Sequence, residues 1–293
     1  FAAHTLRDYA AARAAGNVRQ RVLMGPWAHW SPSSLAGEVD FGFNASDGAL
    51  LLDLQQLDWF DAVLKGVDNG VLDGLALRLF VMGANVWRDE EAWPLARAKV
   101  TPWYLHSEGA ANTLHGNGAL SQVAPGEEAV DTFVYDPRNP VPTRGGGLCC
   151  SATALPAGAF DQRPIEARPD VLVYTSAPLE ADLEVTGPIE VRLWAATSAR
   201  DTDFTAKLVD VGPCGYARNL CDGVIRARHR RTTDTVEWVE PGVAYEYTID
   251  LGPTSNVFKA GHRIRVEISS SNFPKVSRNP NTGGDLASDT ELR

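Results

Sequence analysis

Hydrophobic and polar residues alternate in two different ways along this chain, and the change falls between residues 75 and 95. Before it, apolar positions recur at helical spacing over residues 2–16 and again over residues 46–66. The second stretch has one apolar face, formed by Leu50, Leu54, Leu57, Phe60 and Leu64. We expect that face to pack against another part of the structure.

A short apolar run at residues 22–24 lies between the two predicted helices and is typical of a buried strand. Helix, strand, loop and helix in this order indicate an α/β arrangement in which the helices cover a sheet. One strand does not make a sheet. We therefore expect its partner strands to come from residues before Phe1 or from another chain.

After residue 75 the helical spacing disappears and short strand candidates recur with turn residues between them. Many short strands at this spacing predict an all-β sandwich, plausibly a jelly roll. The domains are therefore expected at residues 1–80 and 81–293. The strand candidates are residues 101–106, 130–135, 171–176, 183–185, 189–196, 204–211, 224–228, 245–251 and 263–270.

The charge of the chain argues against some partners. Its 27 basic and 37 acidic residues give a net charge of −10, which repels a phosphate backbone, so nucleic acid is not an expected partner. The one basic cluster, at residues 226–231, is expected on the exposed face of a strand. No apolar run approaches the ~20 residues that span a bilayer. No signal-like stretch opens the chain, and a cytoplasmic location is the default expectation.

The four cysteines, Cys149, Cys150, Cys214 and Cys221, show no C-x-x-C spacing. No histidine pair has ligand spacing either, so we expect neither zinc nor another metal. One interpretation is that Cys214 and Cys221 flank a turn and lie close in space. Reduced thiols are the favoured interpretation, because the adjacent pair Cys149-Cys150 would be awkward in a disulfide framework.

His29 is the candidate catalytic residue. Gly25-Pro26 ends the strand, which leaves His29 in a loop between Trp27 and Trp30, where an imidazole can transfer protons. From spacing alone, a surface histidine with aromatic neighbours is the favoured interpretation. No G-x-S-x-G nucleophile motif occurs in the chain, so the base has no evident nucleophile. The other histidines considered have non-catalytic interpretations: His4, His106, His115 and His262.

Several segments together resemble the CocE/NonD hydrolases, which include cocaine-esterase-like enzymes, α-amino-acid ester hydrolases and X-Pro dipeptidyl-peptidases. The likeness extends over essentially the whole chain. The matching segments are 25–29 (GPWAH), 79–83 (LFVMG), 87–90 (WRDE), 93–94 (WP), 135–146 (YDPRNPVPTRGG), 161–164 (DQRP), 201–211 (DTDFTAKLVDV) and 269–274 (SSSNFP).

This resemblance implies a serine hydrolase that cleaves ester or amide bonds of small acyl substrates, without a cofactor. The fold implied is the end of an α/β-hydrolase domain followed by a jelly-roll sandwich of the galactose-binding type. His29 is then the triad histidine, and the serine and aspartate are expected upstream of this chain. Phe1 matches a phenylalanine that lines the acyl pocket in this family.

The resemblance also places the loop after residues 145–147 over the active site, which makes Cys149 and Cys150 candidate substrate contacts. An alternative is that this loop only packs between domains. Relatives continue beyond the region of residues 281–284, so the last strand of the sandwich is expected to be missing, and family members often self-associate. The rival function is a non-catalytic jelly-roll binding module with a vestigial hydrolase stub.

Overall fold

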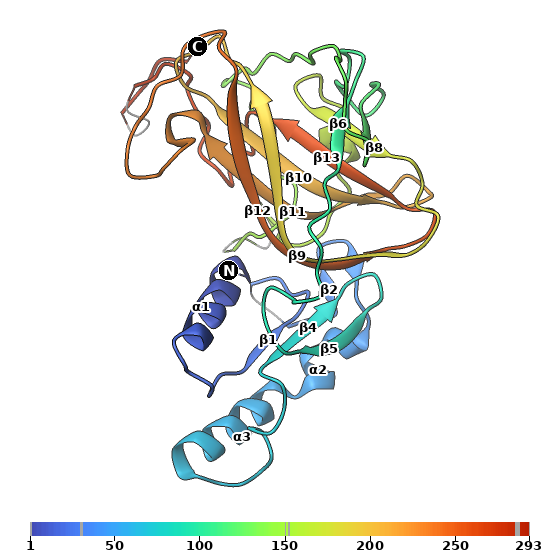
Figure 1. Cartoon of the computed structure of the whole chain (residues 1–293), viewed down its shortest axis with the longest axis vertical. Helices are drawn as coiled ribbons and strands as arrows, with labels where there is room; N and C mark the ends of the chain where they lie inside the picture. Colours follow the sequence, from blue (N-terminus) through green and yellow to red (C-terminus); the bar gives the residue numbers. More distant parts are fainter. Residues whose placement is uncertain (1, 30–31, 150, 152, 285–287, 293) are drawn as a thin grey trace.

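The computed structural model describes residues 2–29, 32–149, 151, 153–284 and 288–292. The chain forms two bodies, which lie one below the other in Figure 1. The lower body contains the helices α1, α2 and α3 and a short sheet, and the upper body consists mainly of β-strands, of which β9 and β12 are the longest. In the described ranges no helix is long and apolar enough to cross a bilayer.

The sheet of the smaller body has the strand order β1-β4-β5. Strand β1 (Val22–Met24) runs parallel to β4 (Leu77–Val81), which pairs in antiparallel fashion with β5 (Val86–Glu90). We expected β1 to pair only with strands outside this chain, and this is wrong for the edge of β1 that pairs with β4. Its other edge pairs with no strand in the described part of the chain. Helix α1 (Ala2–Ala14) buries Leu6 and Tyr9 against this sheet.

The second predicted helix is interrupted. Helix α2 (Asp47–Leu50) and helix α3 (Leu52–Lys65) are separated by Leu51, whose φ of 52° is left-handed, and α3 ends at Gly66 with φ 72°. The apolar stripe faces solvent, contrary to the expectation of a packed face. The exposed fractions of Leu54, Leu57, Phe60 and Leu64 are 54, 53, 52 and 75%.

The larger body is a sandwich of a six-stranded sheet and a two-stranded sheet. The first has the order β11 (Ala217–Arg226), β10 (Asp203–Val211), β13 (Arg263–Ser269), β8 (Leu172–Ser176), β7 (Ala119–Ser121) and β6 (Tyr104–His106). The second pairs β12 (Tyr245–Phe258) with β9 (Leu183–Ala195). Side chains from both sheets meet in one core, where the rings of Phe204 and Tyr247 lie 4.7 Å apart. A mostly β sandwich is therefore confirmed.

Three of the strand predictions need correction. The predicted strands at residues 183–185 and 189–196 are one strand, β9, which continues through Gly187 and Pro188 and ends at Ala195. Residues 130–135 form no strand. Asp131 shows why, since its carboxylate accepts hydrogen bonds from Ala111 N–H (2.8 Å) and the hydroxyl of Tyr174 (2.8 Å). Side-chain contacts, rather than a β-ladder, hold this segment.

The basic cluster at residues 226–231 is not an exposed strand face. Arg226 pairs with Asp203 (2.8 Å) and Arg228 with Asp201 (2.7 Å), and Arg228 is 8% exposed. The carboxylates are themselves buried, and buried charges require partners. Arg226 and Arg228 therefore neutralise buried carboxylates of the sandwich, whereas Arg231 is exposed.

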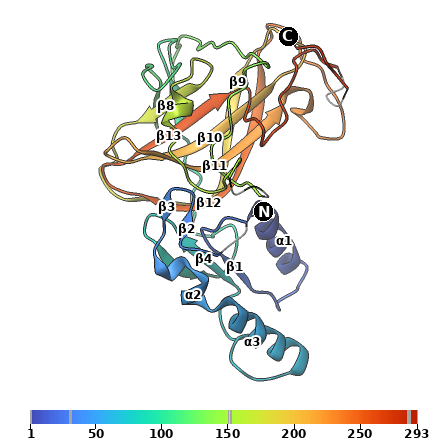
Figure 2. The same ribbon diagram turned by 180° about the vertical axis from the view of Figure 1, so that it is seen from behind.

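The two bodies meet at a small hairpin. Strands β2 (Leu35–Ala36) and β3 (Val39–Asp40) lie just below β12, as Figure 2 shows from behind. Gly37, at the tip of this hairpin, forms a bridge with Ala159 of the larger body. The predicted domain boundary at residue 80 falls in the β4–β5 hairpin, which belongs to the smaller sheet.

Candidate active site

His29 lies in an exposed turn beyond the carboxyl end of β1. Because β1 and β4 are parallel, this is also the edge of the sheet at which β4 ends. Loops at the carboxyl edge of parallel strands are the usual place for reacting groups in α/β structures. The position of His29 is therefore compatible with proton transfer to a group held outside the sheet.

The loop that carries His29 is anchored by Trp27. The indole folds back on Gly25, and its N–H donates to the backbone carbonyl of Ala45 (2.5 Å). The ring also lies 5.8 Å from the ring of Trp87, which in turn packs on Phe80 at 5.2 Å. Trp27 therefore fixes the base of the loop. Trp30 lies outside the described residues.

The three predicted substrate contacts are only partly described. Phe1 and Cys150 lie outside the described residues. Cys149 belongs to the loop between Gly146 and Gly158, whose backbones pair with each other at 2.7 and 3.0 Å. Cys149 is disulfide-bonded, although the sequence made this part of the chain an awkward place for a disulfide.

Cys214 and Cys221 are free, which confirms the favoured interpretation of that pair. Cys214 lies in the exposed turn between β10 and β11, and Cys221 lies on β11 opposite Leu208. Burial raises the pKa of the Cys221 thiol, so that this thiol is a poor nucleophile.

A second histidine has neighbours that the sequence did not suggest. His106, at the end of β6, has Nδ1 at 2.6 Å from a carboxylate oxygen of Glu128 and Nε2 at 3.0 Å from the hydroxyl of Ser121. These are the residue types and distances of a hydrolase triad. Glu128 and Ser121 lie 22 and 15 residues after His106 along the chain, so only the fold reveals that they are neighbours.

The environment of His106 nevertheless argues against an activated serine. Nε2 also lies 3.0 Å from the carbonyl oxygen of Val123, which only accepts hydrogen bonds. A ring nitrogen that donates to the carbonyl of Val123 does not at the same time accept the proton of Ser121. The Ser121 hydroxyl additionally accepts the N–H of Val123 (3.1 Å). We interpret this group as a structural tie between β6 and the segment that follows β7.

His262 is held in a similar structural way. Its Nδ1 lies 2.7 Å from the buried carboxylate of Asp210, which also accepts from Arg218 (2.8 Å). In the described ranges no three His, Cys, Asp or Glu side chains are arranged to hold a metal ion.

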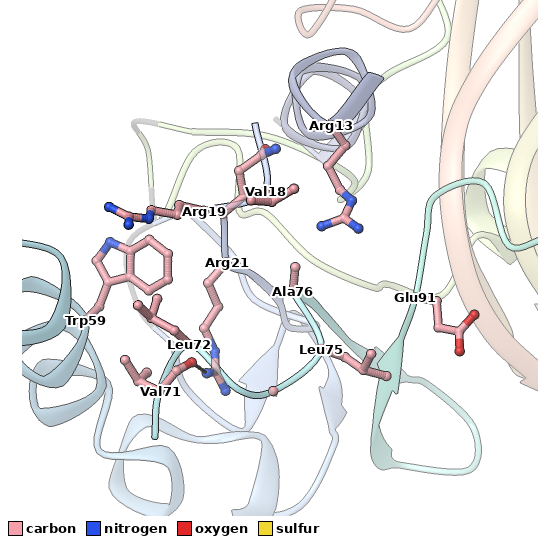
Figure 3. A pocket seen from close by; sticks show the side chains of 12 residues that line it. Arg13, Val18, Arg19, Arg21, Trp59, Val71, Leu72, Leu75, Ala76 and Glu91 are labelled. Atoms are coloured by element: carbon pink, nitrogen blue, oxygen red, sulfur yellow. Dashed lines mark hydrogen bonds between the residues drawn. The ribbon is translucent and has the colours of Figure 1, made fainter. Parts of the chain in front are cut away.

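A cavity of about 580 Å³ lies at the opposite edge of the smaller sheet from His29. Figure 3 shows it between α1, α3 and the segments that lead into β1 and β4. Arg13, Arg19, Arg21 and Trp59 line it, and Arg21 donates to the carbonyl of Val71 (2.8 Å). Because its walls precede both parallel strands, this cavity is separate from the His29 loop.

Comparisons with known proteins agree on one family. The model of the X-Pro dipeptidyl-peptidase C-terminal non-catalytic domain matches residues 69–291. Cocaine esterase from Rhodococcus sp. (strain MB1 Bresler) is 45% identical over 287 residues, which cover 98% of this chain and 49% of that protein.

Two solved structures resemble the chain closely in fold, each with a TM-score of 0.79. One is an aminopeptidase from the marine sediment archaeon Thaumarchaeota archaeon, 28% identical over 95% of this chain and 46% of that one. The other is an α-amino acid ester hydrolase, 27% identical over 94% and 47%. The chain thus spans about half the length of these relatives. It belongs to the family of the X-Pro dipeptidyl-peptidase C-terminal domain, and its resemblance to the cocaine-esterase-like hydrolases is confirmed.

Proposed function

We propose that this chain supplies the general base of a serine hydrolase, that His29 is this base, and that the serine and aspartate of the triad lie upstream. One observation carries the proposal: the His29 loop belongs to the stretch that aligns with cocaine esterase at 45% identity over 98% of this chain. His29 also precedes residue 69, where the match to the non-catalytic domain begins.

In the proposed reaction the imidazole of His29 removes the proton of the serine hydroxyl as the oxygen attacks the acyl carbonyl. The same nitrogen then delivers that proton to the leaving oxygen or nitrogen, which leaves an acyl-serine. Water, deprotonated by His29, releases the acid. Ester or amide bonds of small acyl groups are the proposed substrates, and the scheme uses no metal or cofactor.

The smaller body is, on this proposal, the end of an α/β-hydrolase domain, and the larger body is a galactose-binding-like jelly roll. Two features of the smaller body support it. Strand β1 keeps one edge unpaired within the described ranges, and the apolar face of α3 is exposed. Upstream strands and helices would cover both surfaces, since exposed apolar patches of this kind usually mark contact sites. Phe1, Cys149 and Cys150 are proposed to contact the substrate.

The experiment is hydrolysis of 4-nitrophenyl acetate by the intact protein that contains these residues. His29→Ala should lower kcat by about 10³-fold or more, because a triad acts as a unit. His4→Ala, a histidine on the solvent side of α1, is the matched control and should retain full activity. Equal activity of wild type and His29→Ala would refute the proposed role.

The rival function, a non-catalytic binding module, is favoured by the description of the family model that matches residues 69–291. It accounts for the sandwich but not for the His29 loop. A wild-type protein that hydrolyses no ester, and that is not labelled by a serine-directed fluorophosphonate, would favour this alternative.

A further inference from the structure

The hairpin β2–β3 follows the His29 loop directly in the chain and ends against the sandwich. Its tip makes two backbone hydrogen bonds with the segment after Gly158. The N–H of Glu38 donates to the carbonyl of Ala159 (2.8 Å), and the N–H of Ala159 donates to the carbonyl of Ala36 (3.1 Å). The segment that carries His29 is thereby tied to one particular loop of the sandwich.

The side chain of Glu38 adds three further contacts from three different parts of the sandwich. One carboxylate oxygen accepts from the guanidinium of Arg144 (3.1 Å). The other accepts from the backbone N–H of Asp161 (3.0 Å) and from the hydroxyl of Tyr216 (3.2 Å). Burial, and next the charge of Glu38, raise the pKa of Tyr216 to about 12, so this phenol remains a donor at neutral pH.

Glycines allow the backbones to approach each other at this junction. A Cβ on Gly158 would overlap the backbone of Ala36 and Gly37, and one on Gly145 would lie 2.5 Å from the carbonyl oxygen of Gly158. Gly145 and Gly158 also have positive φ values of 71° and 114°. The contact between the β2–β3 hairpin and the sandwich is therefore formed by close-packed backbone atoms of both segments, and the side chain of Glu38 lies next to it.

The same junction forms the base of the loop that contains Cys149. Gly146 and Gly158 pair through two backbone hydrogen bonds, so the loop leaves and re-enters the sandwich at one point. Glu38 contacts residues on both sides of that point, Arg144 before it and Asp161 after it. Glu38 thus helps to set the position of the loop base relative to the His29 segment, while Met82 ties the smaller sheet to β12 through hydrogen bonds with Ser255 (3.0 Å) and Val257 (2.7 Å).

We propose that Glu38 is a positioning residue that sets acyl-group selectivity by fixing this loop base against the His29 segment. The inference rests on the proposed function. Glu38 itself touches neither substrate nor His29 in this account. Its ion pair with Arg144 is 36–40% exposed and contributes little energy by itself, so the effect comes from geometry.

Loss of the Glu38 contacts should affect substrates with large and small acyl groups differently. A displaced loop changes the room for a large acyl group and leaves the distance from His29 to the reacting atoms unchanged for a small one. Loss of contacts that bind the acyl group equally in the ground state and the transition state raises KM and leaves kcat unchanged. For Glu38→Ala we expect KM for a 4-nitrophenyl benzoate to rise about tenfold, with kcat nearly constant, and the kinetic constants for the acetate to change less than about twofold.

The experiment compares wild type, Glu38→Ala and Glu38→Gln in the intact protein. Glu38→Gln retains an acceptor for Asp161 N–H and Tyr216, so it should restore most of the benzoate KM. Glu127→Ala, at an exposed glutamate of the sandwich, is the matched control and should behave as wild type. An equal loss of kcat/KM for the acetate and the benzoate in Glu38→Ala, or no loss for either ester, would overturn the positioning role.

Amide hydrogen exchange in the same proteins separates this inference from the proposed function. In Glu38→Ala the N–H groups of Gly146, Gly158 and Ala159 should exchange about tenfold faster, and in Glu127→Ala they should not. Unchanged exchange would overturn the inference whatever the activity. If wild type hydrolyses no ester, the proposed function and the selectivity role fail together. Faster amide exchange in Glu38→Ala would even then establish that Glu38 holds the loop base.

Discussion

Replacing Asp201 with alanine should destabilise the sandwich by about 3–5 kcal/mol, because it leaves a buried guanidinium without its counter-charge. Asp201 is fully buried and accepts three hydrogen bonds. Two come from Arg228, through its backbone N–H (2.9 Å) and Nε (2.7 Å), and one comes from the side-chain amide of Asn279 (2.7 Å).

The magnitude follows from these contacts. Hydrogen bonds to charged groups contribute about 1.5–3 kcal/mol each, and Arg228 cannot lose its charge when its partner is removed. Its guanidinium keeps only weaker compensation, a hydrogen bond to the carbonyl of Gly284 (3.1 Å) and a stacking contact 4.6 Å from the ring of Trp238. At about 2–4 °C per kcal/mol for a body of this size, the melting temperature should fall by roughly 6–20 °C.

The assay is urea unfolding followed by tryptophan fluorescence, with Asp201→Ala, Arg228→Ala and the double variant forming a cycle. The two losses should not add, and the coupling should be about 2 kcal/mol or more. Arg231→Ala is the control. Its side chain is 72% exposed and lies 3.4 Å from Glu237, so its loss should cost less than about 0.5 kcal/mol. A loss below about 1 kcal/mol for Asp201→Ala would refute the reasoning.

Three further predictions follow from single contacts. Burial, and next the charge of Glu267, raise the pKa of Glu166 to about 8. The stability that protonated Glu166 contributes is therefore complete below its unfolded pKa of 4.5 and is lost as pH rises through 8. Glu166→Gln should gain stability relative to wild type between pH 5 and 9, and a pH-independent difference in urea unfolding would contradict this. Gly158→Ala should cost about 2–4 kcal/mol through overlap and its positive φ, whereas Gly126→Ala, with open space around it, should be near neutral in the same thermal scan. Ser121→Ala should leave ester turnover unchanged, and any large loss would show that His106 does activate this serine.

Local signals predicted the helix over residues 2–14, strand β1 and the exposed loop that carries His29. Each depends on neighbouring residues, as the stop at Gly25-Pro26 shows. The break at Leu51 has no such signal, because leucine rarely adopts a positive φ. The pairing of β1 with β4 was also missed, since parallel partners more than 50 residues apart leave no local mark.

The burial of charge was the least predictable property. Residues 226–231 have the composition of a solvated basic patch, and only the fold brings Asp201 and Asp203 beneath Arg228 and Arg226. Glu38 was likewise missed, because its partners Arg144, Asp161 and Tyr216 lie more than 100 residues further along the chain. Sequence reasoning located the His29 loop but not what holds it in place.

The central claim is that His29 serves a nucleophilic serine that lies upstream of these residues. The most direct test is to label the intact protein with a fluorophosphonate and to map the modified serine by peptide mass spectrometry, in wild type and in His29→Ala. The account predicts one labelled serine upstream of Phe1 and labelling slowed by about 10²-fold or more in His29→Ala. A label on Ser121 or another serine within residues 1–293, or equal labelling rates in both proteins, would contradict it.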